Sequence, residues 1–148
     1  MAKLIIVIGL PGSGKSHYLR KLKADKLIWA FYDDYQNKAY GKDPDPRLSR
    51  HYGPLLSRLK KGKTMAISDI RYCREPELDW LLKSVLDVLP ETELELHYFE
   101  NKPEAAIKNI KQRTNPQAVE VQLKFVQENS PNYIIPKIKK IPIYSLLK

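Results

Sequence analysis

One stretch near the N-terminus constrains this chain more than any other. Residues 9–16 read Gly-Leu-Pro-Gly-Ser-Gly-Lys-Ser, which fits the pattern G-x-x-x-x-G-K-[ST] of a phosphate-binding loop. Glycines allow positive φ angles and leave backbone N–H groups uncovered, so such a loop can wrap a polyphosphate. The residues predicted to bind nucleotide phosphates are Gly9, Leu10, Pro11, Gly12, Ser13, Gly14, Lys15 and Ser16.

The segments on either side of this loop agree with that prediction. Residues 4–8 form a continuous run of Leu, Ile and Val, which is typical of a central strand buried on both faces. Residues 17–23 place apolar side chains on one helical face. A strand, a glycine-rich loop and a helix therefore follow in the order that a phosphate site needs. We expect Lys15 to reach the β- and γ-phosphates and the Ser16 hydroxyl to bind Mg²⁺.

Length and charge bound the remaining possibilities. The 148 residues suit one domain, and the formal net charge of +9 favours anionic partners such as nucleotides, phosphorylated metabolites or nucleic acid. A lysine-rich surface that only keeps the protein soluble explains the charge equally well. Cys73 is the single cysteine, which excludes an internal disulfide and fits a reducing compartment. We expect a cytoplasmic protein with no membrane segment, and the sequence does not indicate an oligomeric state.

Strand and helix patterns alternate along the rest of the chain. Further strands are expected within residues 27–32, 64–68, 93–99 and 138–147, and helices within 48–62, 76–90, 103–113 and 117–128. We expect a kink or a split in the helix over 48–62, because it contains Gly53 and Pro54. Alternation of this kind predicts an α/β fold with a parallel sheet, whose ligands bind at the carboxyl ends of the strands.

Carboxylates follow two of these strands. Asp69 comes directly after the third strand, where it could hold Mg²⁺ directly or through water, or simply cap a turn. Asp33 and Asp34 end the second strand, where one of them could act as the general base for an attacking hydroxyl. Adjacent carboxylates are also common as solvated turn formers, and spacing does not choose between the two residues.

Two arginines are candidates for binding phosphoryl groups. Arg71 lies two residues beyond Asp69 and could bind an acceptor phosphate bidentately, or pair with Asp69 or Glu75. Arg113 is expected at the end of the helix over 103–113, where a cation is favourable for the helix dipole in any case. It could alternatively belong to a lid that closes over the transferring phosphoryl group.

With these residues in place, the chain resembles the small P-loop kinases, the group of nucleoside and nucleotide kinases, shikimate-type kinases and polynucleotide 5′-kinases. The resemblance covers the element order of the whole chain, and residues 4–16 carry its specific match. It implies a three-layer P-loop NTPase fold with a five-stranded, mainly parallel sheet in the order 2-3-1-4-5 and helices on both faces. It also implies a single domain over residues 1–148, with a lid region at residues 102–130.

The resemblance further implies an ATP- and Mg²⁺-dependent phosphotransferase. In that group the carboxylate after the second strand is commonly the acceptor-side base, which Asp33 or Asp34 matches, Asp69 matches the carboxylate after the third strand, and Arg113 resembles a lid arginine. Together with the reasoning from the residues, the candidate site consists of catalytic Lys15, Asp33, Asp34 and Arg113, metal-binding Ser16 and Asp69, and substrate-binding Asp34 and Arg71. The expected acceptor is a hydroxyl of a small molecule, a nucleoside or a nucleic-acid 5′ end. Residues 67–72, followed by Glu75 and Glu77, are similar to phage-type deoxynucleoside monophosphate kinases, so a monophosphate acceptor is an alternative. A non-kinase ATP-binding module or slow NTPase is another.

Overall fold

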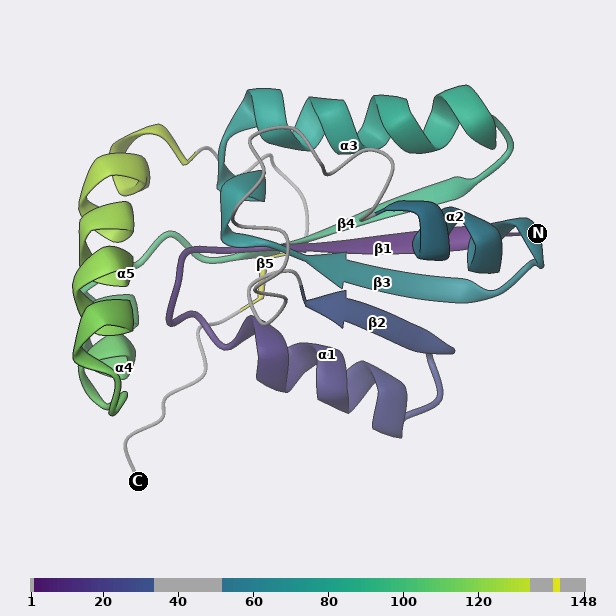
Figure 1. The fold of residues 1–148 in the computed structure, drawn as a ribbon. Coiled ribbons are helices and arrows are strands. Elements are labelled where there is room, and N and C mark those ends of the chain that lie inside the picture. Colours follow the sequence, from purple (N-terminus) through teal and green to yellow (C-terminus); the bar gives the residue numbers. More distant parts are fainter. Residues whose placement is uncertain (1, 34–51, 134–139, 142–148) are drawn as a thin grey trace.

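The computed structural model describes residues 2–33, 52–133 and 140–141. Its centre is a parallel sheet in the order β2-β3-β1-β4-β5 (Figure 1). The strands are β1 (Lys3–Ile8), β2 (Ala30–Asp33), β3 (Thr64–Ser68), β4 (Glu93–Phe99) and β5 (Lys140–Ile141). β5 contributes two residues, which pair with Tyr98 and Phe99, so the sheet rests mainly on the other four strands. The remainder of the edge strand expected within 138–147 lies outside the described residues.

Burial explains why β1 is the central strand. Five of its six residues are buried, and they belong to the continuous apolar run that indicated a strand covered on both faces. β1 pairs along its length with β3 on one side and β4 on the other. β3 and β4 have the bounds that the sequence predicts, whereas β2 begins at Ala30 instead of residue 27. The reason is local: the Leu27 N–H donates to the Leu22 carbonyl, so residues 25–27 close the preceding helix.

Five α-helices and two short 3₁₀-helices complete the described fold. They are α1 (Lys15–Ala24), α2 (Tyr52–Lys60), η4 (Ile70–Cys73), α3 (Glu75–Val88), α4 (Pro103–Lys111), α5 (Pro116–Asn129) and η5 (Ser130–Asn132). Pro54 falls in the first turn of α2, where its missing N–H costs no helical hydrogen bond. The kink or split expected at Gly53 and Pro54 also involves the residues before Tyr52, which lie outside the described residues, so it stays a prediction.

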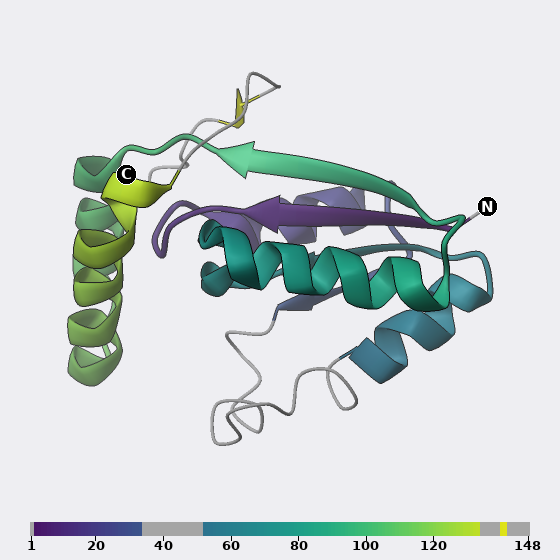
Figure 2. The ribbon, with the colours of Figure 1, turned by 90° about the horizontal axis from the view of Figure 1, so that it is seen from above.

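The helices cover both faces of the sheet. Leu19 and Leu22 of α1 pack with Ile5 and Val7 on one face, while the larger core cluster on the other face includes side chains of α2 and α3. α4 and α5 stand side by side across the end of the sheet toward which the strand arrows point (Figures 1 and 2). The chain thus has a mixed α/β fold, and the carboxyl end of its sheet faces the α4–α5 pair. No helix in the described ranges is long and apolar enough to cross a membrane.

Candidate phosphate-binding site

The predicted phosphate-binding loop connects β1 to α1 and uses glycine where the backbone requires it. Gly12 and Gly14 have φ angles of 81° and 99°, in the left-handed region that other residues rarely adopt. Gly14 is also the N-cap of α1, so the positive end of the helix dipole faces the loop. The backbone therefore has the geometry of an anion site at a helix N-terminus.

One carbonyl organises the interior of this loop. The Leu10 oxygen accepts hydrogen bonds from Lys15 Nζ at 2.8 Å, from Ser13 Oγ at 2.7 Å and from the Ser13 N–H at 3.2 Å. Lys15 is only 9% exposed, so its ammonium is folded over the loop and largely removed from water. A buried ammonium near a neutral carbonyl gains strongly from an approaching phosphate, because low local dielectric strengthens charge attraction.

Helix α4 packs directly on the tip of the loop. Asn109, which is 2% exposed, donates from Nδ2 to the Gly12 carbonyl at 2.7 Å. A Cβ atom added to Gly12 would lie 2.4 Å from the Ala106 carbonyl oxygen and 2.8 Å from Ile110 Cγ1. Gly12 is therefore required both by its φ angle and by the close approach of α4. The contact ties the first part of the expected lid region to the loop.

Two buried side chains, Tyr133 and Cys73, lie close to the start of the loop. The Tyr133 hydroxyl lies 3.1 Å from the Ile8 carbonyl oxygen and 2.5 Å from that of Phe99, which joins the ends of β1 and β4. Burial raises the pKa of the Tyr133 hydroxyl, so it stays protonated as a donor. Burial likewise raises the pKa of the Cys73 thiol to about 12, although the charge of Lys15 acts in the opposite direction. Both groups are therefore neutral, and they contact the backbone where β1 passes into the loop, at Ile8 and Gly9.

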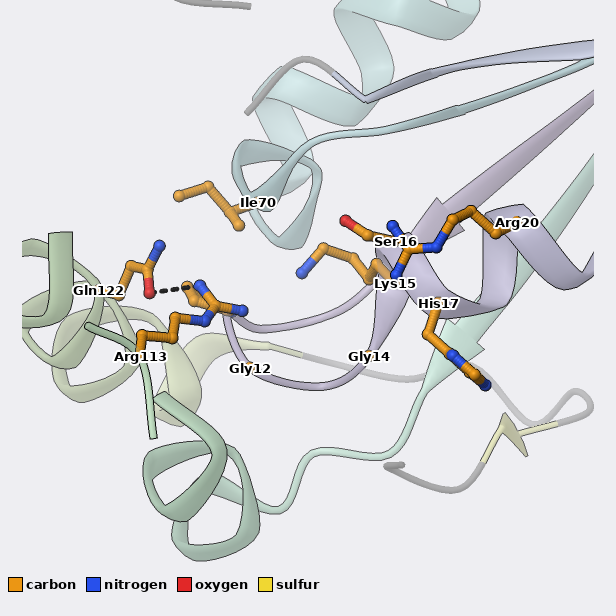
Figure 3. Close-up of a pocket in the computed structure, with 10 residues that line it drawn as sticks. Gly12, Gly14, Lys15, Ser16, His17, Arg20, Ile70, Arg113 and Gln122 are labelled. Atoms are coloured by element: carbon orange, nitrogen blue, oxygen red, sulfur yellow. Dashed lines mark hydrogen bonds between the residues drawn. The ribbon is translucent and has the colours of Figure 1, made fainter. Parts of the chain in front are cut away.

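A pocket of about 170 Å³ opens beside the loop. Its lining residues are Pro11, Gly12, Gly14, Lys15, Ser16, His17, Arg20, Ile70, Arg113 and Gln122. Three of these side chains are cations, and none of the ten is a carboxylate. Figure 3 shows Lys15 pointing toward the side of the pocket where Arg113 and Gln122 lie. The arrangement can bind a polyanion, with positive charge supplied from α1 and from the α4–α5 connection.

The structure brings six of the predicted site residues together. Arg113 lines the same pocket as five residues of the loop, namely Pro11, Gly12, Gly14, Lys15 and Ser16. Arg113 lies two residues beyond the end of α4, where its Nη1 donates to Gln122 Oε1 at 2.5 Å. Asp69 follows β3, which is adjacent to β1, so it lies at the same end of the sheet as the loop. It is not among the residues that line the pocket.

Asp69 and Arg71 make contacts that the sequence offered as alternatives. Arg71 pairs with the Asp69 carboxylate, with Nη2 at 2.5 Å from Oδ2 and Nε at 3.1 Å from Oδ1. The Asp69 side chain also caps η4 by accepting from the Arg71 N–H at 2.8 Å. Asp33 ends β2, with its backbone opposite Ser68. The side chain of Asp33, and all of Asp34, lie outside what the structure describes, so their role as a base stays a prediction.

Several residues of the pocket and its support were not predicted from sequence. Arg20 is one helical turn after Ser16, and this i,i+4 spacing could have placed it beside the loop. His17 also lines the pocket, and no sequence pattern marks it. Asn109 and Gln122 come from about a hundred residues further along the chain, and no local pattern marks them.

Comparisons with the sequences of known proteins find one relative and no family. No protein-family model matches the chain. An uncharacterised protein of Acanthamoeba polyphaga mimivirus is 28% identical over 139 residues, which cover 93% of this chain and 91% of that protein. That relative has no described activity from which a function could be transferred.

Solved structures extend the comparison. A gluconokinase from Sinorhizobium meliloti superimposes with a TM-score of 0.54 at 15% identity, covering 95% of this chain and 81% of that one. A chain of the Pnkp1/Rnl/Hen1 RNA repair complex gives a TM-score of 0.54 at 17% identity over 93% of this chain. The match spans 49% of that longer chain. At these identities the likeness is one of fold, and the chain has a P-loop kinase-like α/β fold.

Proposed function

We propose that this chain is an ATP- and Mg²⁺-dependent phosphotransferase that moves the γ-phosphoryl group of ATP to a hydroxyl group. The cationic pocket beside the phosphate-binding loop carries the proposal. It combines the buried Lys15 with Arg20 and Arg113, and its ten lining residues include no carboxylate. The positive charge of these three side chains matches the negative charge of the triphosphate group of a nucleotide.

The side chains present suit phosphoryl transfer, which asks the protein mainly for positioning and electrostatic stabilisation. Backbone N–H groups of the loop and the N-terminus of α1 would hold the donor phosphates. Lys15 would exchange its contact with the Leu10 carbonyl for phosphate oxygens, and Arg113 would approach from the opposite wall. Because Gln122 is 1% exposed and binds Arg113, the arginine is already oriented in the described structure.

The residues near the loop also fit a magnesium ion. The Ser16 hydroxyl and the Asp69 carboxylate are oxygen donors, and Mg²⁺ usually binds one or two protein oxygens together with substrate phosphates. Within the described ranges, no group of three or more His, Cys, Asp or Glu side chains could hold a metal ion by itself. The ion would therefore bind with the nucleotide, and when bound it neutralises charge on the β- and γ-phosphates. The pairing of Asp69 with Arg71 favours binding through a water molecule.

The acceptor in this proposal is a hydroxyl group, activated by Asp33 or Asp34. A phosphate acceptor would need an arginine clamp instead, and the Arg71 guanidinium is already paired with Asp69. This pairing weighs against the monophosphate kinase alternative. Because α4 is fixed to the loop by Asn109, lid closure would be confined to the α4–α5 connection that carries Arg113. We place the reaction in the cytoplasm.

An acceptor screen tests the proposal. ATP consumption is measured with nucleosides, nucleoside monophosphates, 5′-hydroxyl oligonucleotides and small polyols. We expect slow hydrolysis with ATP alone and fast turnover with one hydroxyl class. A rate that no acceptor raises, and that responds only to a macromolecule, would favour the NTPase switch.

Variants then separate the two kinds of acceptor. Loss of the base in Asp33→Asn or Asp34→Asn should lower kcat by roughly 10²–10⁴-fold with little change in ATP affinity. Loss of a clamp in Arg71→Ala should chiefly raise the acceptor KM. If both aspartate variants keep near-wild-type kcat while Arg71→Ala loses acceptor binding, the monophosphate kinase alternative replaces the hydroxyl-acceptor hypothesis.

A further inference from the structure

Positive and negative side chains are separated across the sheet. Residues 15–33 and 52–64, which form α1, β2, α2 and adjoining turns, contain nine Lys or Arg and two Asp. Residues 75–100, which form α3 and β4, contain eight Asp or Glu and one Lys. β2 and β4 lie on opposite sides of the β3–β1 pair (Figure 1). These two groups of residues carry net charges of +7 and −7, and a uniform solubilising surface would not require such a separation.

An exposed tryptophan lies within this basic edge. Trp29 directly precedes β2. Its backbone N–H donates to the Thr64 carbonyl at 2.7 Å, so its backbone is held against β3. The side chain is nevertheless 50% exposed. An indole left half in water keeps apolar surface that folding alone would bury. Trp29 therefore offers a fixed aromatic surface at the edge of the sheet.

Two cations lie over this tryptophan. The Arg58 Cζ atom is 5.6 Å from the centroid of the Trp29 ring, and Lys63 Nζ is 5.2 Å from it. Arg58 also lies 5.7 Å from the Tyr32 ring centroid and donates to the Tyr32 hydroxyl. The cluster thus combines the start of β2, helix α2 and the turn before β3. It places two positive charges beside the rings of Trp29 and Tyr32.

We propose that this cluster, the Trp29 edge (Trp29, Tyr32, Arg58 and Lys63), binds single-stranded nucleic acid. A base stacks on the exposed part of Trp29, and Arg58 and Lys63 neutralise flanking phosphates. Further lysines nearby in sequence extend the positive surface, namely Lys26, Lys60 and Lys61. Stacking on an indole requires an unpaired base, which is why a single strand fits this surface better than a duplex.

The Trp29 edge is separate from the phosphate-binding loop. Trp29 precedes the amino end of β2, whereas the loop follows the carboxyl end of β1, and the sheet is parallel. Trp29 and the phosphate-binding loop are thus at opposite ends of the strands, while Tyr32 directly precedes Asp33 at the carboxyl end of β2. The inference does not depend on the proposed kinase activity, and it can be tested without ATP.

Binding is measured by fluorescence anisotropy with a labelled oligothymidine of about ten nucleotides, within the size range of single-strand sites. Trp29→Leu should weaken binding by roughly 5- to 100-fold, which is the loss of one stacked base. Trp80→Leu is the matched control: it makes the same exchange at a 42% exposed tryptophan on α3, in the acidic half, and should leave the affinity unchanged. Equal affinities for the Trp29 variant and wild type overturn the proposal.

Three further variants test separately for stacking, for charge and for binding at the phosphate-binding loop. Trp29→Phe, which keeps an aromatic ring, should retain more affinity than Trp29→Leu; a loss equal to that of the leucine variant contradicts stacking. Lys63→Gln should reduce the slope of log K against log salt by about one. Lys15→Ala should bind the oligonucleotide like wild type, and its failure to do so would place the strand at the phosphate-binding loop instead.

The single-tryptophan variant Trp80→Phe reports the contact directly, because the chain has two tryptophans. Added oligothymidine should quench the Trp29 emission of this variant. Inorganic polyphosphate and a duplex of equal charge serve as competitors, and both should compete less well than the single strand. If either competes equally well, or emission is unchanged while anisotropy rises, the edge is a general polyanion surface and the proposal fails.

Discussion

The phosphate pocket and the Trp29 edge are both basic, but they are built in opposite ways. In the pocket, Lys15 is 9% exposed and held by a backbone carbonyl, while α4 fixes the loop through Gly12. At the edge, Trp29 is 50% exposed, and the two cations beside it, Arg58 and Lys63, are half-buried. A buried, backbone-built site selects ligands by geometry. A partly exposed cluster of side chains selects by charge and stacking, and is more sensitive to salt.

Two glycines with nearly the same φ angle provide the strongest test of this contrast. Gly12, at the pocket, has φ of 81°, and Gly62, in the turn beside Lys63, has φ of 80°. Alanine should cost about 1–2 kcal/mol at either position for the left-handed conformation alone. In Gly12→Ala the new Cβ would also lie 2.4 Å from a backbone oxygen, whereas at Gly62 nothing lies within 4 Å.

We therefore expect Gly12→Ala to lose several kcal/mol of unfolding free energy and all Mg-ATP binding. Gly62→Ala should show only the smaller loss and keep wild-type ATP affinity. Urea denaturation and calorimetric titration measure the two quantities. Equal effects of the two substitutions would mean that α4 does not constrain the loop.

We expect a smaller difference in unfolding free energy when one polar or charged side chain is replaced in each region. Asn109→Leu removes the donor to the buried Gly12 carbonyl and should lower the unfolding free energy by about 1–3 kcal/mol, with weaker ATP binding. Arg58→Gln removes cation–π contacts beside the half-exposed Trp29 and should cost about 1 kcal/mol or less, without an effect on ATP. Urea denaturation and calorimetric titration again measure the two quantities. A larger loss of unfolding free energy in Arg58→Gln than in Asn109→Leu would contradict this expectation.

How far each region could be predicted from sequence follows from the same difference. The loop is contiguous, and its glycines, lysine and serine have a fixed spacing, so residues 9–16 could be identified without a structure. Strands β3 and β4 have distinct apolar patterns and were predicted with their observed bounds. Asn109 could not be identified, because its partner Gly12 is 97 residues away and buried amides have no sequence pattern.

The Trp29 edge could not be predicted at all. Trp29 lies far from Arg58 and Lys63 in sequence, and no aromatic–basic spacing connects it to them. They meet because β2, which follows Trp29, pairs with β3, and because α2 and the turn after it lead directly into β3. The ion pair between Asp69 and Arg71 is an intermediate case, since their two-residue spacing suggested it as one of several options.

Thermal unfolding with and without Mg-ATP tests the central claim most directly, in wild type and in Lys15→Ala. At about one hundred times its Kd, a ligand that binds only the folded protein stabilises it by about 2.7 kcal/mol. We predict that wild type gains stability of this order, while the variant remains folded by circular dichroism and gains none. Stabilisation of Lys15→Ala equal to that of wild type would contradict the assignment of residues 9–16 as a nucleotide phosphate site.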